Sequence, residues 1–161
     1  MPYMIDGHNL IPKVRGLSLQ NLDDELELVK RLQIFCRVRR QTVEVYFDKA
    51  AAGRSGTKRF GLVNAHFVPE NSNAYSAIRQ ALKRLERKAR NWQVVSSDRQ
   101  VQAEARSAHA GVLSAEAFAF QLEEALIQAI KSPSAEQGLS PEEVDAWLEL
   151  FNRDRGENSS L

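Results

Sequence analysis

The sequence predicts a three-layer α/β/α domain in which helices cover both faces of a mainly parallel sheet of about five strands. Short apolar runs alternate with longer amphipathic segments, and most of the turns between them are short. Parallel strands joined by helical crossovers produce this alternation, and right-handed crossovers place the helices on both faces. With 161 residues and 43% apolar residues, the chain has the size of one hydrophobic core.

Five segments have the features of strands, because they are short, apolar and rich in β-branched or aromatic residues. Their expected positions are residues 3–5, 43–47, 62–68, 92–95 and 111–113. Five other segments have apolar residues at three- and four-residue steps, which predicts helices. These are expected at residues 21–41, 72–91, 99–109, 115–130 and from Pro141 to about Phe151. Three glycines among four cations predict an exposed, mobile loop at residues 49–61.

These elements divide the chain into three parts. Residues 1–130 form the expected domain, and residues 131–152 comprise a linker and a helix that packs on or near it through Trp147 and Phe151. Residues 153–161 are expected to be a disordered tail. A lone cysteine, Cys36, excludes a disulfide and a cysteine metal site and favours a reducing, cytoplasmic setting. No signal-like or membrane-spanning stretch occurs, so we expect no membrane partner; the oligomeric state stays open.

Charge is distributed unevenly along the chain. Residues 1–112 hold 19 basic and 11 acidic residues, a net +8, whereas residues 113–161 hold 3 basic and 10 acidic residues, a net −7. A basic body is typical of proteins that bind a phosphate backbone, which makes RNA a candidate partner. Solvated helix faces are the alternative explanation. The candidate phosphate contacts are Arg54, Lys58, Arg59, Arg79, Lys83 and Arg99.

Three expected strands run into an aspartate, at Asp6, Asp48 and Asp98. The carboxyl ends of parallel strands meet at one edge of a sheet, where ligands bind in open α/β folds. Carboxylates that converge repel one another, and a hard cation such as Mg²⁺ or Mn²⁺ relieves the repulsion. Such an ion can promote hydrolysis of a phosphodiester. Asp48 could instead cap the following turn.

Other chemistries lack their motifs. No G-x-G-x-x-G or P-loop follows a strand, so we expect no nucleotide cofactor. An aspartyl phosphatase would have a second aspartate two residues after Asp6, where this chain has His8. His8 could take part in proton transfer or have no role.

The ordered motifs Asp6-Gly7-His8-Asn9, Val45-Tyr46-Phe47-Asp48 and Val94-Val95-Ser96-Ser97-Asp98-Arg99 resemble those of YacP-like NYN domains, which are PIN-like ribonucleases. The resemblance extends from about Tyr3 to Phe118, and the helix from Leu139 to Phe151 is similar to a common tail of that family. It implies a PIN-like fold and a metal-dependent endoribonuclease that acts on mRNA or at the ribosome. In that case Asp6 and Asp98 are metal ligands, and Asn9 orients the site or stabilises its own loop.

One departure from the family pattern concerns the helix after the third strand. Family members place one or two aspartates there in an A-D-D-x-I pattern, and this chain has Ala74-Tyr75-Ser76-Ala77-Ile78. Losing a carboxylate weakens the hold on a cation. The sequence therefore supports three hypotheses: a metal-dependent ribonuclease that uses Asp6, Asp98, Asp48 and Asn9, an inactive RNA- or ribosome-binding module, and a protein-interaction domain with an acidic carboxyl-terminal surface.

Overall fold

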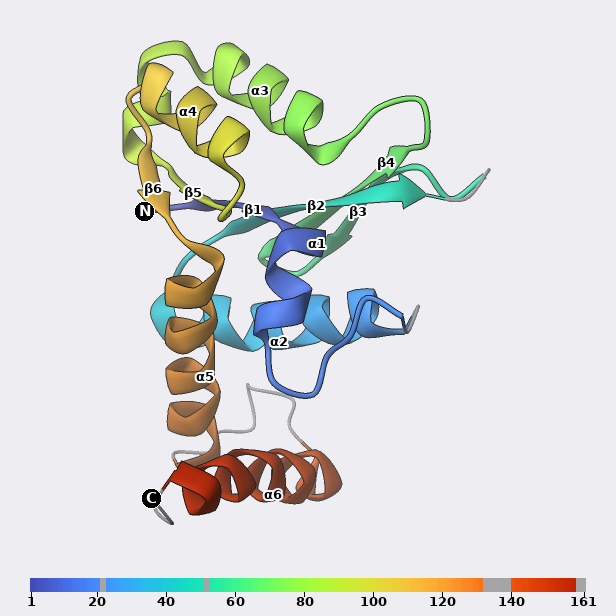
Figure 1. The fold of residues 1–161 in the computed structure, drawn as a ribbon, viewed down its shortest axis with the longest axis vertical. Helices are drawn as coiled ribbons and strands as arrows, with labels where there is room; N and C mark the ends of the chain where they lie inside the picture. Colours follow the sequence, from blue (N-terminus) through green and yellow to red (C-terminus); the bar gives the residue numbers. More distant parts are fainter. Residues whose placement is uncertain (21–22, 51–52, 132–139, 159–161) are drawn as a thin grey trace.

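A six-stranded sheet forms the centre of the molecule, in the order β3-β4-β2-β1-β5-β6 (Figure 1). The structure is a computed structural model that describes residues 1–20, 23–50, 53–131 and 140–158, with side chains described as far as residue 152. The strands are β1 Tyr3–Asp6, β2 Val43–Ala50, β3 Gly56–Phe60, β4 Val63–Pro69, β5 Gln93–Val95 and β6 Gly111–Leu113. All neighbouring pairs are parallel except β3 and β4.

Helices cover both faces of this sheet, as the sequence predicts. The helices α3 Ala74–Leu85 and α4 Arg99–Ser107 lie on one face, and α2 Asp24–Arg39 and α5 Ala115–Lys131 lie on the other (Figure 1). Side chains of β1 alternate between the two cores: Met4 packs with Ile78 on the α3–α4 side, and Ile5 packs with Leu32 on the α2–α5 side. The fold is thus the predicted α/β class with a mainly parallel sheet.

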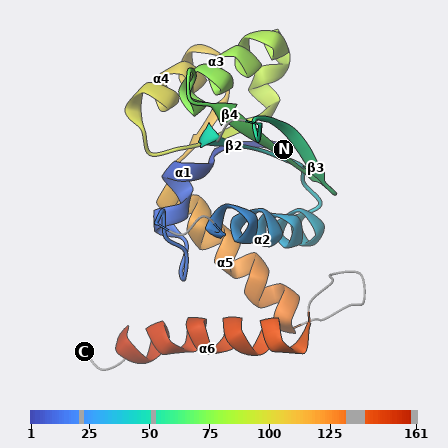
Figure 2. The ribbon, with the colours of Figure 1, turned by 90° about the vertical axis from the view of Figure 1, so that its right-hand side faces the viewer.

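Helix α6, Pro141–Asn158, lies beyond α2 and α5 on the side away from the sheet (Figure 2). Trp147 and Phe151 are buried in the α2–α5 core, and the Arg31 guanidinium carbon lies 5.6 Å from the centre of the Trp147 ring. Lys30 and Glu143 form an ion pair between α2 and α6. The helix continues to Asn158, although a disordered tail is predicted after Asn152. A nucleated helix gains one backbone hydrogen bond for each residue that it adds, so α6 can extend beyond the residues that pack on the core.

The largest difference from the sequence prediction lies at residues 49–61, where β2 continues to Ala50 and residues 56–60 form an antiparallel edge strand, β3. The prediction of a loop is therefore wrong at residues 49–50 and 56–60, whereas residues 53–55 and 61 form turns or irregular structure as expected; residues 51–52 lie outside the described residues. Gly56 and Gly61 have φ values of 125° and 60°, a left-handed backbone that glycine adopts without strain. Four of the five β3 residues are exposed, so the strand lacks the apolar alternation that predicts one.

Two further local differences concern helices. The chain after β1 forms a short helix, α1 Gly7–Leu10, and a 3₁₀ turn, Ile11–Lys13, where the sequence predicts a loop. The helix expected at residues 72–91 ends at Leu85, and a 3₁₀ segment, Glu86–Asn91, follows it. Glu86 has a φ of 51°, which an α-helix does not allow, and this residue breaks the predicted helix.

Candidate functional site

The candidate site lies at the edge of the sheet where β1, β2 and β5 end. These strands are adjacent and parallel, with Ile5 in register with Val45 on one side and Val95 on the other. Asp6 is the last residue of β1, Asp48 lies near the end of β2, and Asp98 follows β5. The strand order therefore brings three acidic residues that are distant in the sequence to one edge, and we name this group the acidic centre.

Asp6 is the buried member of the acidic centre, with 9% of its surface exposed. Burial is the main cause that raises the pKa of Asp6 to about 6, and the charges of Asp48 and Asp98 raise it further. Hydrogen bonds from the Ser96 hydroxyl, at 3.3 Å, and from the Asn9 backbone oppose this rise. A carboxyl whose ionisation is disfavoured by burial and by neighbouring acids gains from a cation placed beside it.

The turn that follows Asp6 requires glycine. A Cβ atom at Gly7 would lie 2.9 Å from the Tyr46 carbonyl oxygen and closer still to the Phe47 ring. The backbone can therefore pass against β2 at this point only without a side chain. This close approach carries the chain from Asp6 directly into α1, where His8 and Asn9 stay beside the acidic centre.

Asp48 and Asp98 each use one carboxylate oxygen to fix a helix. Asp48 Oδ1 accepts a hydrogen bond from the backbone of Ala74 at the start of α3. Asp98 caps α4, because its Oδ1 accepts a hydrogen bond from the Gln100 backbone at 2.8 Å. The capping role that the sequence leaves open for Asp48 is thus present in the structure. The hydrogen bonds described engage Oδ1 in both residues.

Two hydrogen bonds link the acidic centre to the β5–α4 connection. The Ser96 hydroxyl donates to Asp6 and accepts from the Asp98 backbone at 3.0 Å, so it bridges two of the three acids. The Asn9 side-chain oxygen accepts from the Ser97 backbone at 2.7 Å. Asn9 therefore connects two distant segments instead of stabilising only its own loop. Ser96 lies within the motif that ends in Asp98, but no role was predicted for it.

His8 extends the site toward α2. Its Nε2 lies 2.8 Å from Glu25 Oε1, and this hydrogen bond raises the pKa of His8. The imidazole also lies against Phe47, with 5.7 Å between ring centres. Glu25 belongs to the first turn of α2 and was not predicted as a site residue. Nothing local in the sequence links it to His8, since the contact depends on how α2 packs against α1.

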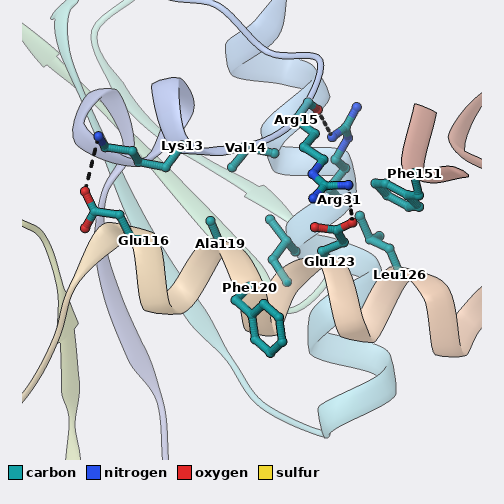
Figure 3. A pocket seen from close by; sticks show the side chains of 11 residues that line it. Lys13, Val14, Arg15, Arg31, Glu116, Ala119, Phe120, Glu123, Leu126 and Phe151 are labelled. Atoms are coloured by element: carbon teal, nitrogen blue, oxygen red, sulfur yellow. Dashed lines mark hydrogen bonds and ion pairs between the residues drawn. The ribbon is translucent and has the colours of Figure 1, made fainter. Parts of the chain in front are cut away.

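A second rim of the site is formed where α5 begins. Glu116 accepts a hydrogen bond from the Ser97 hydroxyl at 2.7 Å and forms an ion pair with Lys13 at 3.2 Å. These contacts, with the Ser97 bond as the largest cause, lower the pKa of Glu116 to about 2. Figure 3 shows Lys13 and Glu116 beside a hollow of about 230 Å³ that α5 forms with the chain after α1 and with Phe151.

The start of α3 carries Tyr75 and Ser76 in place of the acids of the family pattern. The Tyr75 hydroxyl donates a hydrogen bond to Glu104 Oε1 at 2.7 Å, and Arg79 Nε lies 3.7 Å from the same oxygen. The Asp98 charge is close enough to contribute to a raised pKa of Tyr75, after the larger effect of Glu104. A tyrosine that binds an acid on α4 thus occupies this side of the acidic centre.

The structure divides the predicted phosphate contacts among several surfaces. Arg54 and Lys58 line a hollow of about 460 Å³ between the beginning of α2 and the β2–β3–β4 part of the sheet. We name it the α2–β3 hollow; its lining also includes Glu25, Leu26, Lys49 and Phe67. Arg59 is paired with Asn64, next to the Lys58–Ala65 pair, and successive strand residues point to opposite faces. Arg59 therefore lies away from Arg54 and Lys58.

The remaining three cations lie on the α3–α4 side. Arg79 approaches Glu104, Lys83 is exposed on α3, and Arg99 is exposed directly after Asp98. Among these, Arg99 is next to the acidic centre in sequence. The six candidate phosphate contacts therefore lie on different sides of the sheet.

A divalent cation fits the chemistry of the acidic centre, although the three acids do not form a closed ligand group. Within the described residues, no three His, Cys, Asp or Glu side chains are placed to hold one ion together. The tight three-carboxylate cluster that the sequence predicts is therefore not formed. Mg²⁺ usually binds through one or two carboxylates and completes its shell with water and substrate phosphates. At this edge Ser96 links the Asp6 carboxylate to the backbone of Asp98.

Comparisons with known proteins agree with this architecture. The family model of the YacP-like NYN domain matches residues 3–151. The crystal structure of Rae1 (YacP) from Bacillus subtilis superposes with a TM-score of 0.68 at 21% sequence identity and covers 95% of both chains. A tryptophan-to-leucine mutant of the same Bacillus subtilis protein gives a TM-score of 0.61 at 20% identity, over 97% of this chain and 99% of the other. A comparison with curated proteins finds no match.

The fold and the acids at the ends of its parallel strands define a PIN-like α/β protein. More particularly, the chain belongs to the YacP-like NYN domain family, a PIN-like nuclease family. This confirms the resemblance inferred from the motifs. NYN domains are in general nucleases that depend on divalent metal ions. None of the helices in the described part of the chain is long and apolar enough to cross a membrane.

Proposed function

We propose that the protein is a metal-dependent endoribonuclease that hydrolyses phosphodiester bonds of RNA. The observation that carries this proposal is the buried Asp6, whose pKa is raised to about 6 by burial and by Asp48 and Asp98. At neutral pH the ionised Asp6 beside two other acids lowers the stability of the fold, and a cation bound among them would relieve this cost. Membership in a PIN-like nuclease family supports the same reaction class.

In this proposal, Asp6 and Asp98 hold Mg²⁺ or Mn²⁺ and Asp48 adds negative charge from β2. A bound divalent ion polarises a phosphodiester and lowers the pKa of a coordinated water. Asn9 and Ser96 are positioning residues, because they fix the β5–α4 connection that carries Asp98. Arg99, directly after Asp98, is in place to contact a phosphate of the bound RNA.

A reducing, cytoplasmic setting is part of this proposal. Cys36 is buried and unpaired, and burial raises the pKa of its thiol to about 12, so it is an inert core residue suited to a reducing cytoplasm. The basic body of the chain suits a polyanionic partner. Messenger RNA and ribosome-associated RNA are the first substrates to test.

A second candidate function is RNA binding without efficient cleavage. Tyr75 and Ser76 bring no carboxylate to the start of α3, and Tyr75 instead donates a hydrogen bond to Glu104. A weaker negative charge around Asp6 would lower metal affinity while leaving the basic surfaces intact.

One experiment separates these functions. Cleavage of a long single-stranded RNA is measured with Mn²⁺ and with a chelator, for the wild type and for Asp6→Asn and Tyr75→Asp. We expect Mn²⁺-dependent cleavage that falls roughly 100-fold or more in Asp6→Asn, because the ion loses a charged ligand. Asp145→Asn is the matched control, since Asp145 is an exposed aspartate on α6.

The outcomes differ for each hypothesis. Cleavage that appears only in Tyr75→Asp identifies an inactive member of the nuclease family that binds RNA. Cleavage that is equal in the wild type and in Asp6→Asn contradicts the proposed site. If the wild type neither cuts nor retains RNA at moderate salt, both RNA functions are rejected.

A further inference from the structure

The α2–β3 hollow combines a concave shape with two kinds of lining. Its volume of about 460 Å³ lies within the range of roughly 300–1,000 Å³ that is typical of small-ligand sites. Leu26, which is 55% exposed, and Phe67 give it apolar surface. Its lining carries three cations, Lys49, Arg54 and Lys58, and two acids on the α2 side, Asp23 and Glu25. Lys58 Nζ lies 5.9 Å from the centre of the Phe67 ring.

The hollow begins beside the acidic centre. Lys49 directly follows Asp48, and Glu25 on the opposite wall holds His8 by a hydrogen bond. Aromatic contacts continue from His8 to Phe47 at 5.7 Å and from Phe47 to Phe67 at 5.5 Å, between ring centres. A chain bound at the acidic centre can therefore extend into the hollow by its adjacent unit.

The lining selects a flat group that carries a phosphate. Apolar and aromatic side chains bind the face of a nucleobase, and lysine and arginine bind the phosphate of the same nucleotide. The Glu25 carboxylate on the opposite wall can accept a hydrogen bond from an exocyclic amino group of a base. An acidic peptide would use the cations alone and would be repelled by this wall.

We propose that the α2–β3 hollow binds one unpaired nucleotide of the RNA next to the phosphodiester held at the acidic centre. The base lies between Leu26 and Phe67, and its phosphate contacts Lys58 and Arg54. This inference rests on the proposed RNA function and requires that the nucleotide be unpaired, because bases within a duplex expose no free face to the hollow.

Neighbouring residues of β3 provide a matched pair of variants. Lys58 and Arg59 are both exposed cations, but Lys58 lines the hollow and Arg59 points to the other face of the sheet. Lys58→Ala removes a phosphate contact, whereas Arg59→Ala removes the same charge outside the hollow. Leu26→Gln removes apolar surface while keeping a good helix former in α2, and Leu62→Gln changes another exposed leucine as its control.

The test measures binding of a labelled oligoadenylate in a chelator, so that cleavage does not interfere. We expect Lys58→Ala to weaken binding about tenfold and to reduce the salt dependence by about one counterion, and Arg59→Ala to change affinity about twofold at most. An oligomer with abasic sites is expected to bind about tenfold more weakly than oligoadenylate to the wild type and to Leu62→Gln. In Leu26→Gln this difference should shrink.

Several results would overturn the inference. If Lys58→Ala and Arg59→Ala bind oligoadenylate equally well, Lys58 makes no phosphate contact. If the wild type binds abasic and normal oligomers equally well, the hollow makes no contact with a base. Equal affinity for a matched duplex contradicts the preference for unpaired RNA. An oligoglutamate peptide that binds the wild type but not Lys58→Ala would instead assign the hollow to an acidic protein.

The inference and the nuclease proposal can fail separately. If the wild type cleaves RNA with Mn²⁺ and Lys58→Ala and Leu26→Gln bind and cleave as it does, the hollow has no role and the nuclease proposal stands. If oligoadenylate binds as expected but no variant cleaves it, the hollow is a binding site on a protein that is not a nuclease. Thermal unfolding of each variant verifies that the fold is intact.

Discussion

Asp6 and Asp98 follow adjacent parallel strands, but their surroundings differ. Asp6 is 9% exposed, because β1 lies between β2 and β5 and the chain turns at once into α1. Asp98 is exposed and caps α4, because β5 is followed by a connection that leaves the sheet. The same sequence pattern, an apolar run that leads to an aspartate, therefore produces a destabilised buried acid in one place and a stabilising helix cap in the other.

The comparison shows that carboxyl groups at neighbouring strand ends can have different roles in one site. A buried carboxyl gains most from a cation, whereas an exposed carboxyl that caps a helix has a reason to be present without one. Asp48 lies between these extremes, since it is half-buried and accepts a hydrogen bond from the backbone at the start of α3. Substitutions that remove charge without changing shape should separate the three cases.

The largest expected effect is a stabilisation by Asp6→Asn at neutral pH. In the native protein the pKa of Asp6 is about 6, above the value of 3.8 that applies to an unperturbed aspartate. The native state thus binds more protons than the unfolded state between these values, and its stability falls as the pH rises through them. Above pH 6 the ionised carboxylate lowers the free energy of unfolding by up to about 3 kcal/mol. Asp6→Asn has no charge at this position and should recover that free energy.

Denaturant unfolding in a chelator, at about pH 7.5 and about pH 4, measures this effect. The stabilisation should nearly disappear at the lower pH, where Asp6 is protonated in the native state. If Asp6→Asn destabilises the protein at both pH values, the ionised Asp6 does not lower the stability of the native state. Asp6 and Asp98 would then not differ in the way proposed.

A smaller effect is expected at Asp48. Asp48→Ala leaves the buried backbone N–H of Ala74 without its acceptor, whereas Asp48→Asn keeps an oxygen in that place. Both variants remove the same charge near Asp6, so their difference isolates the hydrogen bond. We expect Asp48→Ala to be less stable than Asp48→Asn by about 1–3 kcal/mol. Equal midpoints of urea unfolding would show that α3 does not depend on this bond.

The smallest effect is expected at Asp98, where the change affects only a helix cap. Asp98→Ala removes the acceptor for the Gln100 backbone, and Asp98→Asn retains a good capping residue. Asp98→Ala should therefore be about 1 kcal/mol less stable than Asp98→Asn. Thermal unfolding of the two variants tests this value. If Asp98→Ala loses more stability than Asp48→Ala, the exposed acid contributes more than the half-buried one, and the expected order is wrong.

Much of the fold could be predicted because the relevant signals are local. The β1 run Tyr3-Met4-Ile5 and the helical period of α5 are visible in short windows of sequence, and both elements formed as predicted. The edge strand β3 gave no such signal, since it is exposed and polar and is defined only by its pairing with β4. The end of α3 at Leu85 was likewise missed, because the helical pattern continues past Glu86, whose positive φ ends the helix.

The sequence by itself determined that aspartates follow parallel strands and that they share one edge, since both conclusions depend on chain direction and strand periodicity. Only the tertiary structure decided that Asp6 is buried, that Glu25 holds His8, and that Lys58 and Arg59 face opposite sides. Burial and pairing arise from segments that are far apart in the chain. Their energies therefore depend on packing that no local window of residues contains.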